Sequence, residues 1–264
     1  MHHHYLTAIE AALEAGKAIN EIYQRPFEVE IKADNSPLTE ADQKANGIIN
    51  SFLEPTGIPI ISEENKQLDY SERKDWETCW IVDPLDGTKE FIKRNGEFTV
   101  NIAQVYFGKP KFGVIYAPHT RELYFAEVAG EWAKKIDVPN SYGSLKELLE
   151  SAVDISPKVD DKQMRIVGSR SHLNEDTKNF IEDIITPKEK EIVSKGSSLK
   201  FCLIAEGKAD VYPRFAPTME WDTAAGQAIC EAVGVHVLAL PANSLMSYNK
   251  EDLLNPWFLV TKEL

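Results

Sequence analysis

Cysteine, positive charge and long apolar runs are all scarce in this 264-residue sequence. The three cysteines, Cys79, Cys202 and Cys230, lie far apart inside apolar stretches, which excludes a disulfide scaffold and predicts a reducing compartment. No window approaches the roughly 18 apolar residues that a membrane span requires. The N-terminus lacks the order of charged, apolar and small residues that marks a signal peptide. We therefore expect a cytoplasmic protein without an integral membrane segment, and leave open a peripheral association with the inner face of the cell membrane.

The charge balance is acidic, because 29 lysines and arginines stand against 42 aspartates and glutamates, for a net charge of −13. Such a balance argues against a protein that coats a nucleic acid polymer or binds an anionic membrane, since both need clustered cations. The remaining composition, 43% hydrophobic and 27% charged, is that of a globular protein. A small anionic substrate is still compatible if metal ions neutralise its site. The histidine run at residues 2–4 is either a tag or natural sequence, and we set it aside.

Hydrophobic spacing in the first half predicts two helices followed by an antiparallel sheet. Apolar residues at helical intervals predict an amphipathic helix over residues 5–23, and a second helix opens at residues 39–42 and ends before Pro55. Residues 66–77 are charged and show no period, which predicts a surface loop. The expected strands, separated by turn residues, are residues 58–61, 80–82, 98–106, 112–116 and 122–128.

The second half alternates strands with helices, which is typical of α/β architecture. The strands expected there are residues 164–167, 191–193, 209–212, 235–240 and 257–260. The helices expected between them are residues 174–185, a helix from residue 199 capped by Gly207, and a helix from residue 223 capped by Gly234. Turn formers cluster at residues 136–162. We expect the junction of two halves there, the first comprising residues 1–136 and the second residues 137–264.

The most informative stretch is residues 80–88, W-I-V-D-P-L-D-G-T. A fully apolar strand delivers Asp83 to its carboxyl end, and a tight turn brings Asp86 back beside it. Two carboxylates at that separation repel each other unless one is protonated or a cation bridges them. Mg²⁺ prefers such oxygen ligands, the Leu85 carbonyl is another, and the amides of Gly87 and Thr88 at a helix N-terminus face an anion such as phosphate. The alternative is that both aspartates are ordinary turn and cap residues.

Further acids stand at the ends of other predicted elements. Glu63 and Glu64 follow an apolar strand, and Asp222 immediately precedes a helix of small residues. Taken alone, Asp222 is better interpreted as a helix N-cap, and Asp42 as the acidic half of a capping box with Thr39. Four separate element ends that each carry an acid are harder to explain by capping than one.

These segments resemble the lithium-sensitive, Mg²⁺-dependent phosphatases, which include inositol monophosphatase, fructose bisphosphatase and the bisphosphate nucleotidases. The superfamily motifs are D-P-L-D-G-T at residues 83–88 and W-D-T-A-A-G at residues 221–226, preceded by the S-E-E turn at residues 62–64. The segments that look like the 3'(2'),5'-bisphosphate nucleotidases are residues 36–42, 89–99 and 168–172. The resemblance spans essentially the whole chain. It implies an α+β fold, a layered α/β/α/β/α sandwich with its metals at the junction of the two halves.

The resemblance also implies the ligands of two or three Mg²⁺ ions per site. The first ion would be held by Glu63, Asp83 and the Leu85 carbonyl. The second would be held by Asp83, Asp86 and Asp222. The first half therefore supplies most of the metal ligands, and the second half supplies Asp222 and the nucleotide-binding residues.

The catalytic residues implied by the resemblance are Thr88, Glu63 and Asp42. Thr88 would hydrogen-bond the attacking water together with Glu63 or Asp42, and a third, weaker ion would use Glu63 with a water held by Asp42. Glu64 is adjacent and acidic, and alignment with the family's turn favours Glu63. A phosphate monoester is a dianion that repels hydroxide, and paired divalent ions cancel this charge while lowering the pKa of a bound water. No covalent phosphoenzyme is expected.

A bisphosphorylated nucleotide carries a second phosphate, which needs cations from the protein. The candidates are Lys200 beside Ser197, Arg214 after a predicted strand, and Arg170 and His172 in one loop. By resemblance to nucleotidases, Ser197, Lys200, Arg214 and His172 would hold the nucleoside and its 5'-phosphate. The alternative for each cation is a solvated surface side chain.

The leading hypothesis is Mg²⁺-dependent hydrolysis of adenosine 3',5'-bisphosphate to AMP and phosphate, linked to sulfate assimilation. One alternative is an inositol or sugar monophosphatase on the same scaffold, because one fold serves several substrates. An alternative of another class is a catalytically silent module that binds nucleotide or metal for regulation. The range of nucleotides, the acceptance of sulfated nucleotides and the oligomeric state are left open by the sequence.

Overall fold

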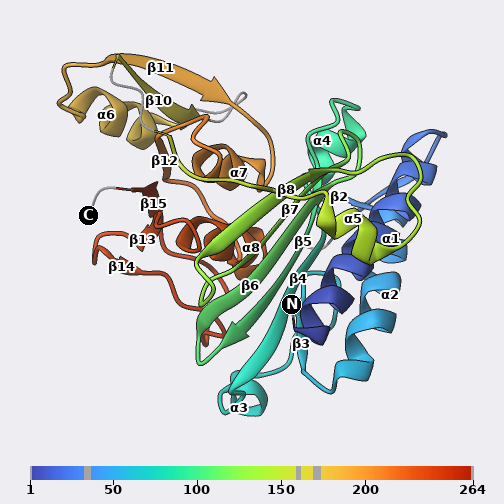
Figure 1. The fold of residues 1–264 in the computed structure, drawn as a ribbon. Coiled ribbons are helices and arrows are strands. Elements are labelled where there is room, and N and C mark those ends of the chain that lie inside the picture. The colour runs from blue at the N-terminus through green and yellow to red at the C-terminus, as the bar shows by residue number, and fades with distance from the viewer. Residues whose placement is uncertain (1, 33–36, 159–161, 169–173, 263–264) are drawn as a thin grey trace.

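Helices and sheets alternate in five layers in the computed structural model, which describes residues 2–32, 37–158, 162–168 and 174–262 (Figure 1). A pair of helices covers one face of a seven-stranded sheet, and two further helices separate that sheet from a six-stranded sheet. One more helix lies on the outer side of the second sheet. The predicted α/β/α/β/α sandwich is confirmed.

The first helix layer is formed by α1 (His3–Tyr23) and α2 (Glu40–Leu53). α1 buries an apolar face because its alanines and isoleucines recur at helical spacing. α2 begins at a capping box, as the sequence predicts. The Thr39 side chain accepts from the backbone amide of Asp42, and the Asp42 carboxylate accepts from the backbone amide of Thr39. This start of α2 matters for the site, because it fixes the Asp42 carboxylate inside the protein, where the residue is 2% exposed.

The seven-stranded sheet is antiparallel except for the pairing of its first two strands, which is parallel. Its strands, in spatial order, are β3 (Ile60–Ser62), β4 (Thr78–Asp86), β5 (Thr99–Tyr106), β6 (Lys109–Ala117), β7 (Glu122–Glu127), β8 (Trp132–Asp137) and β9 (Val153–Asp154). Alternate residues of β4 serve the two cores: Trp80 and Val82 face α1 and α2, whereas Ile81 faces the central helices. Both faces are buried, so the strand reads as a continuous apolar run.

Short elements decorate this half. They are β1 (Val29–Ile31), β2 (Pro37–Thr39), the 3₁₀ turn η1 (Glu54–Thr56), α3 (Tyr70–Arg73), α4 (Thr88–Ile92) and α5 (Leu145–Glu150). α3 corrects the prediction of a plain surface loop over residues 66–77, because Arg73 within it is only 3% exposed. Because the segment is charged and shows no hydrophobic period, the sequence gives no sign that Arg73 is buried.

The six-stranded sheet is mixed. Its strands, in spatial order, are β11 (Glu189–Ser194), β10 (Gln163–Gly168), β12 (Val211–Arg214), β15 (Phe258–Thr261), β13 (His236–Ala239) and β14 (Ser244–Leu245). The central helices α7 (Leu199–Ala205) and α8 (Glu220–Glu231) lie between the two sheets, and α6 (Glu175–Asp183) covers the outside through Phe180, which contacts Phe215.

The change from one sheet to the other falls within residues 136–162, where the sequence predicts the junction, and beyond residue 136, where the first half was expected to end. β8 was not predicted, and it pairs with both β7 and β9, so the first sheet extends to Asp154. The second sheet begins at Gln163. In the described ranges, every helix is too short or too polar to cross a bilayer.

Candidate active site

Parallel pairing of β3 with β4 brings the first acids together. Ser62 pairs with Val82, and the amide of Glu63 donates to the Val82 carbonyl at 3.2 Å. Glu63 and Asp83 therefore leave neighbouring strands at the same end of the sheet. Two parallel strands end at the same side of a sheet, so the residues that follow them lie close together. The apolar runs of β3 and β4 favour this pairing.

A β-bulge adds Asp86 to the same place. Asp83 pairs with Asn101 and Asp86 pairs with Thr99, so β4 has one residue more than β5 across this interval. The extra residue shifts the alternation of side chains and turns Asp86 to the side of Asp83. The amide of Leu85 donates to Asp83 Oδ1 at 3.0 Å, which holds the first carboxylate in this turn.

The second half supplies Asp222 from the first turn of α8. The helix begins at Glu220, two residues before Asp222, so Asp222 is not the N-cap that its position in the sequence suggested. Its Oδ2 accepts instead from the amide of Met219 at 2.7 Å, which is the reciprocal half of a capping box. One carboxylate oxygen caps the helix, and the residue still faces the acids of the first half.

Asp83, Asp86 and Asp222 form one group, in which one oxygen from each carboxylate lies within 4.8 Å of the others. Burial, followed by repulsion from Glu63, Asp86 and Asp222, raises the pKa of Asp83 well above its ordinary value. Burial and the neighbouring Asp86 raise the pKa of Asp222 to about 7. Such a cluster is costly in the ionised form unless a cation is bound, and its donors are all oxygen, as Mg²⁺ prefers. The residues present therefore fit a hard divalent ion.

Glu63 does not belong to this group of three. Its Oε1 accepts from Lys32 Nζ at 2.9 Å, and Lys32 also bonds the adjacent Glu64. Burial raises the pKa of Glu63, and the ion pair with Lys32 acts in the opposite direction. Lys32 lies at the end of β1 and was not identified from the sequence. The role of Glu63 as a metal ligand stays a prediction.

Thr88 lies between Asp42 and the Leu85 carbonyl. Its hydroxyl is 3.1 Å from Asp42 Oδ1 and 3.3 Å from the Leu85 oxygen, and it can donate to either. The other Asp42 oxygen accepts from the amide and hydroxyl of Thr39. Burial raises the pKa of Asp42, while these hydrogen bonds lower it. The capping interpretation of Asp42 is thus confirmed, and its other carboxylate oxygen lies beside Thr88.

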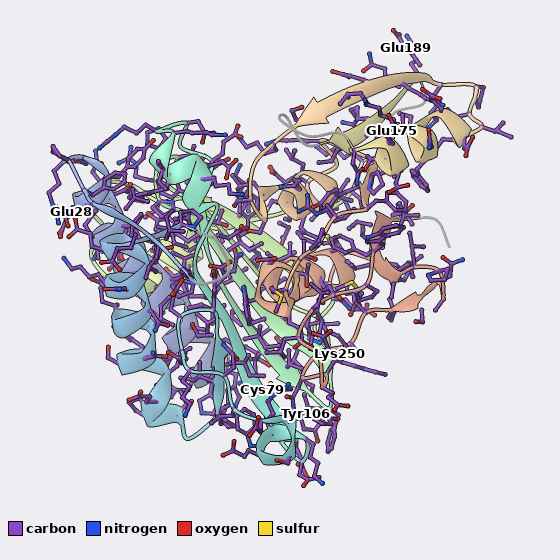
Figure 2. All side chains as sticks on the ribbon, turned by 180° about the vertical axis from the view of Figure 1, so that it is seen from behind. Glu28, Cys79, Tyr106, Glu175, Glu189 and Lys250 are labelled. Carbon is purple, nitrogen blue, oxygen red and sulfur yellow. The ribbon has the colours of Figure 1, made fainter. Side chains whose placement is uncertain are left out.

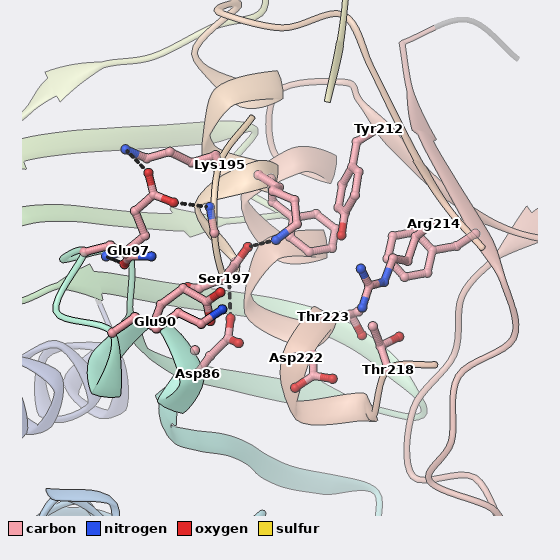
Figure 3. A pocket seen from close by; sticks show the side chains of 18 residues that line it. Asp86, Glu90, Glu97, Lys195, Ser197, Tyr212, Arg214, Thr218, Asp222 and Thr223 are labelled. Carbon is pink, nitrogen blue, oxygen red and sulfur yellow. Dashed lines mark hydrogen bonds and ion pairs between the residues drawn. The ribbon is translucent and has the colours of Figure 1, made fainter. Parts of the chain in front are cut away.

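A cavity of about 430 Å³ opens beside the aspartates, and its wall carries several cations (Figure 3). Lys200 donates to the Ser197 carbonyl at 2.7 Å, and burial lowers the pKa of its ammonium to about 8. Arg214 reaches the cavity from the end of β12, and its Nε is buried with no hydrogen-bond partner in the described structure. Gly87 also lines the wall.

The turn that carries Ser197 is hydrogen-bonded to one of the three aspartates, Asp86. The amide of Ser198 donates to Asp86 Oδ2 at 2.6 Å, and the Ser198 hydroxyl lies 2.7 Å from both Thr99 Oγ1 and Asn101 Oδ1. These contacts join the start of α7 to β5 across the two halves. The predicted residues Ser197, Lys200 and Arg214 therefore line the same cavity as Asp86 and Asp222. Arg170 and His172 lie outside the described residues.

Sequence reasoning missed other residues of the cavity wall. They are Glu90, Glu97, Lys195, Tyr212 and Thr218. Two of them could have been found from the sequence. Lys195 directly precedes the Gly196-Ser197 turn. Tyr212 is two residues from Arg214, so the side chains of Tyr212 and Arg214 share one face of β12. Glu97 accepts from the Gly196 amide at 2.9 Å, a contact between segments that no local pattern indicates.

Comparisons with known proteins agree with this geometry. The model of the inositol monophosphatase family matches residues 1–261. The 3'(2'),5'-bisphosphate nucleotidase CysQ of Shigella flexneri is 43% identical over 256 residues, 96% of this chain and 97% of that protein. The protein of the same name from Haemophilus influenzae is 32% identical over 255 residues, 94% of this chain and 89% of that protein.

A solved structure is similar over almost the full length. It is CysQ from Bacteroides thetaiotaomicron, described as a bacterial member of the inositol monophosphatase family, with 50% identity and a TM-score of 0.87. The match covers 98% of this chain and 97% of that one. On the fold, the motifs and these similarities, the chain belongs to the inositol monophosphatase family.

Proposed function

We propose that this chain is a phosphatase that removes the 3'-phosphate of adenosine 3',5'-bisphosphate and releases AMP and phosphate. The observation that carries the proposal is the meeting of three aspartates from both halves beside a cavity lined by Lys200 and Arg214. The aspartates would hold the metal ions that bind the phosphate to be hydrolysed. Lys200 and Arg214 would bind the second phosphate. The relatives named 3'(2'),5'-bisphosphate nucleotidase support this substrate.

The cofactor we propose is Mg²⁺, two or three ions per site, held by Asp83, Asp86 and Asp222 and further by Glu63 and the Leu85 carbonyl. Bound divalent ions supply charge neutralisation of the phosphate and a water of lowered pKa. The support is the chemistry of the donor set, which offers only oxygen and carries excess negative charge.

Thr88 has the geometry to orient the attacking water. Its hydroxyl gives its one proton to Asp42 or to the Leu85 carbonyl, so its lone pairs accept a hydrogen bond from a water. That acceptor, together with Asp42 or Glu63, directs the water at phosphorus. On the other side, a water beside Asp222 protonates the departing 3'-oxygen.

We assign the 5'-phosphate to Lys200, Arg214 and Ser197, with Lys195 at the cavity wall. The buried Nε of Arg214 has no hydrogen-bond partner in the described structure, and an anion in the cavity would satisfy it. Inositol 1-phosphate has no second phosphate for these cations, which disfavours it as the main substrate. Arg170 and His172 stay predictions.

The test is phosphate release by the purified chain with Mg²⁺ from adenosine 3',5'-bisphosphate and from inositol 1-phosphate. The proposal expects kcat/KM for the bisphosphate to exceed that for the inositol ester by at least about tenfold, from one charge-assisted contact alone. Equal or better turnover of the inositol ester would support the sugar-phosphatase alternative. No turnover of either substrate would support the silent binding module.

Further expectations follow from family membership. We propose that Li⁺ in the millimolar range inhibits hydrolysis, and that the reaction clears a by-product of sulfate activation in sulfur metabolism. Unchanged activity in millimolar Li⁺ would contradict the first. The cytoplasmic location stays a prediction, to which the three buried free thiols lend support.

A further inference from the structure

Asp222 is the one member of the aspartate group that the second half supplies. Its distance from Asp83 and Asp86 depends on where the first turn of α8 lies against the seven-stranded sheet. A displacement of that turn by an ångström would open the group. The contacts that hold this turn therefore bear on metal binding.

Glu220, two residues before Asp222, is completely buried, at 0% exposure. Its Oε2 accepts from the Asn249 amide at 2.7 Å, and its Oε1 accepts from the Lys250 amide at 3.0 Å and from Lys250 Nζ at 2.5 Å. Its own amide donates to the Leu253 carbonyl at 3.0 Å. Every charged atom of this side chain is committed to the segment that follows β14.

The same segment also contacts the first turn of α8 through Asn255. Asn255 Nδ2 donates to the Met219 carbonyl at 2.7 Å and is 3.0 Å from Thr223 Oγ1. The Asn255 amide donates to the Thr218 carbonyl at 2.9 Å. Residues on both sides of Asp222 are thus attached to residues 249–255.

Arg73 of α3 ties this segment to the first half. Its guanidinium donates to Asn249 Oδ1 at 2.8 Å and to the Glu251 carbonyl at 2.8 Å, and Asn249 Nδ2 donates back to the Arg73 carbonyl at 2.8 Å. Burial raises the pKa of the Cys79 thiol of β4, Glu220 raises it further, and Arg73 lowers it. Figure 2 shows Lys250 beside this end of the first sheet, near Cys79 and Tyr106.

We propose that Arg73, Glu220, Asn249 and Lys250, which we call the Glu220 clamp, are positioning residues that hold Asp222 at ligand distance from Asp83 and Asp86. The proposal rests on the proposed metal site. A buried ion pair is poor evidence for stabilisation by itself, since desolvation offsets its attraction. The clamp instead ties one helix turn of the second half to α3 of the first half, which precedes β4, the strand that carries Asp83 and Asp86.

The test is Mn²⁺ binding to the full chain without substrate, measured by isothermal titration calorimetry. Glu220→Gln keeps the volume but removes the charge that pairs with Lys250. The proposal expects its Mn²⁺ affinity to fall about tenfold, as for other outer partners of metal ligands. The Mg²⁺ concentration for half-maximal activity should rise by a similar factor, with kcat at saturating Mg²⁺ falling less than about twofold.

The matched control is Glu206→Gln. Glu206 is also a largely buried carboxylate, bonded by the Tyr124 hydroxyl at 2.7 Å and by Lys208 at 2.8 Å, but these partners lie outside the first turn of α8 and outside residues 249–255. Its variant should lose comparable thermal stability and keep the Mn²⁺ affinity of the parent. Equal affinity in both variants and the parent would overturn the clamp, as would an equal loss in both variants.

Lys250→Met decides the question if Glu220→Gln does not fold. It leaves the two backbone amides on Glu220 and removes only the ammonium, so we expect about a threefold loss of Mn²⁺ affinity; an unchanged affinity would overturn the clamp. Asp83→Asn separates the two proposals. If the parent binds Mn²⁺ no better than Asp83→Asn, both the proposed metal site and the clamp are refuted. If Asp83→Asn weakens Mn²⁺ binding but Glu220→Gln and Lys250→Met do not, only the clamp is refuted.

Discussion

Asp83 is the residue in which the conflict between folding and function is most direct. It is a carboxylate at 1% exposure, and burial together with the charges of three other acids holds its pKa well above the usual range. A side chain chosen for stability alone would not be an acid here. An acid is retained because it serves a ligand that offsets the repulsion.

Asp83→Asn should therefore move stability and activity in opposite directions. The amide keeps the volume and removes one negative charge, so the melting temperature in a metal chelator should rise. Mg²⁺-dependent hydrolysis should fall at least about a hundredfold, because even outer partners of metal ligands cost 10- to 100-fold. Thermal scanning and a phosphate-release assay check the two arms. A parallel fall of both would indicate a structural role.

Thr88 presents a narrower question, since its hydroxyl serves both Asp42 and the Leu85 carbonyl. Thr88→Val should lower kcat about a hundredfold, because the attacking water loses the hydrogen-bond acceptor that orients it, and should leave Mn²⁺ affinity within about twofold. Thr88→Ser retains the hydroxyl and should keep most of the activity. Steady-state kinetics with calorimetry distinguishes these outcomes. Loss of metal affinity in Thr88→Val would contradict the role in orienting water.

Among the elements, α8 approaches the first sheet unusually closely. A Cβ on Gly113 of β6 would lie 2.5 Å from the Ala225 carbonyl oxygen and 2.8 Å from the Ala228 Cβ. Only glycine permits this contact, because helix backbone cannot yield as a flexible side chain does. This close packing places Asp222, in the first turn of α8, beside Asp83 and Asp86 at the C-terminal end of β4.

Gly113→Ala should accordingly damage stability and metal binding together. Overpacking at this interface is expected to cost about 1–3 kcal/mol in the free energy of unfolding and to weaken Mn²⁺ binding. Gly47→Ala is the control, because nothing lies within 4 Å of a Cβ there and the residue is inside α2. It should stabilise by about 0.5–1 kcal/mol with metal affinity unchanged. Urea denaturation and calorimetry measure both effects.

Elements whose signals are local were predictable from the sequence. The α2 capping box and the strand of residues 80–82 depend on neighbours along the chain. β8 was missed because W-A-K-K-I-D mixes two half-buried lysines with two buried residues, a weak alternation that its pairing with β7 makes stable. Arg73 was missed because its partners are residues 249–251, which no spacing rule connects to it.

In the whole molecule, the site is a product of docking between two sheets. Convergence of Asp83 and Asp86 follows from one strand and its bulge, and therefore from the sequence motif. The pairing of Lys32 with Glu63 joins a hairpin to a distant turn, and the cavity wall combines β12 with α4. These contacts need the complete fold, so the sequence supplied their residues only through resemblance or not at all.

The pH dependence of stability is a property of the whole chain. Asp222 has a folded-state pKa of about 7, above the unfolded value of about 4. A carboxyl with a raised pKa favours folding fully below the unfolded value, and this contribution is lost as pH rises through the folded value. In chelator, the free energy of unfolding relative to Asp222→Asn should therefore fall between pH 4 and pH 7, by at most about 4 kcal/mol, less for its partial exposure.

Urea denaturation of the parent and of Asp222→Asn at several pH values measures this difference. Saturating Mg²⁺ is the control, because a bound cation lowers the pKa of its ligands and should flatten the profile. A profile that is identical with and without Mg²⁺ would contradict the assignment of Asp222 to a metal site.

The central claim is that acids from separate segments hold divalent ions at one centre. A crystal of the chain grown with Mn²⁺ and recorded at the manganese absorption edge tests it most directly. The account predicts an anomalous peak coordinated by carboxylate oxygens of Asp83, Asp86 and Asp222, next to the cavity that carries Lys200 and Arg214. Manganese peaks confined to other surfaces, with the three aspartates free of metal, would contradict it.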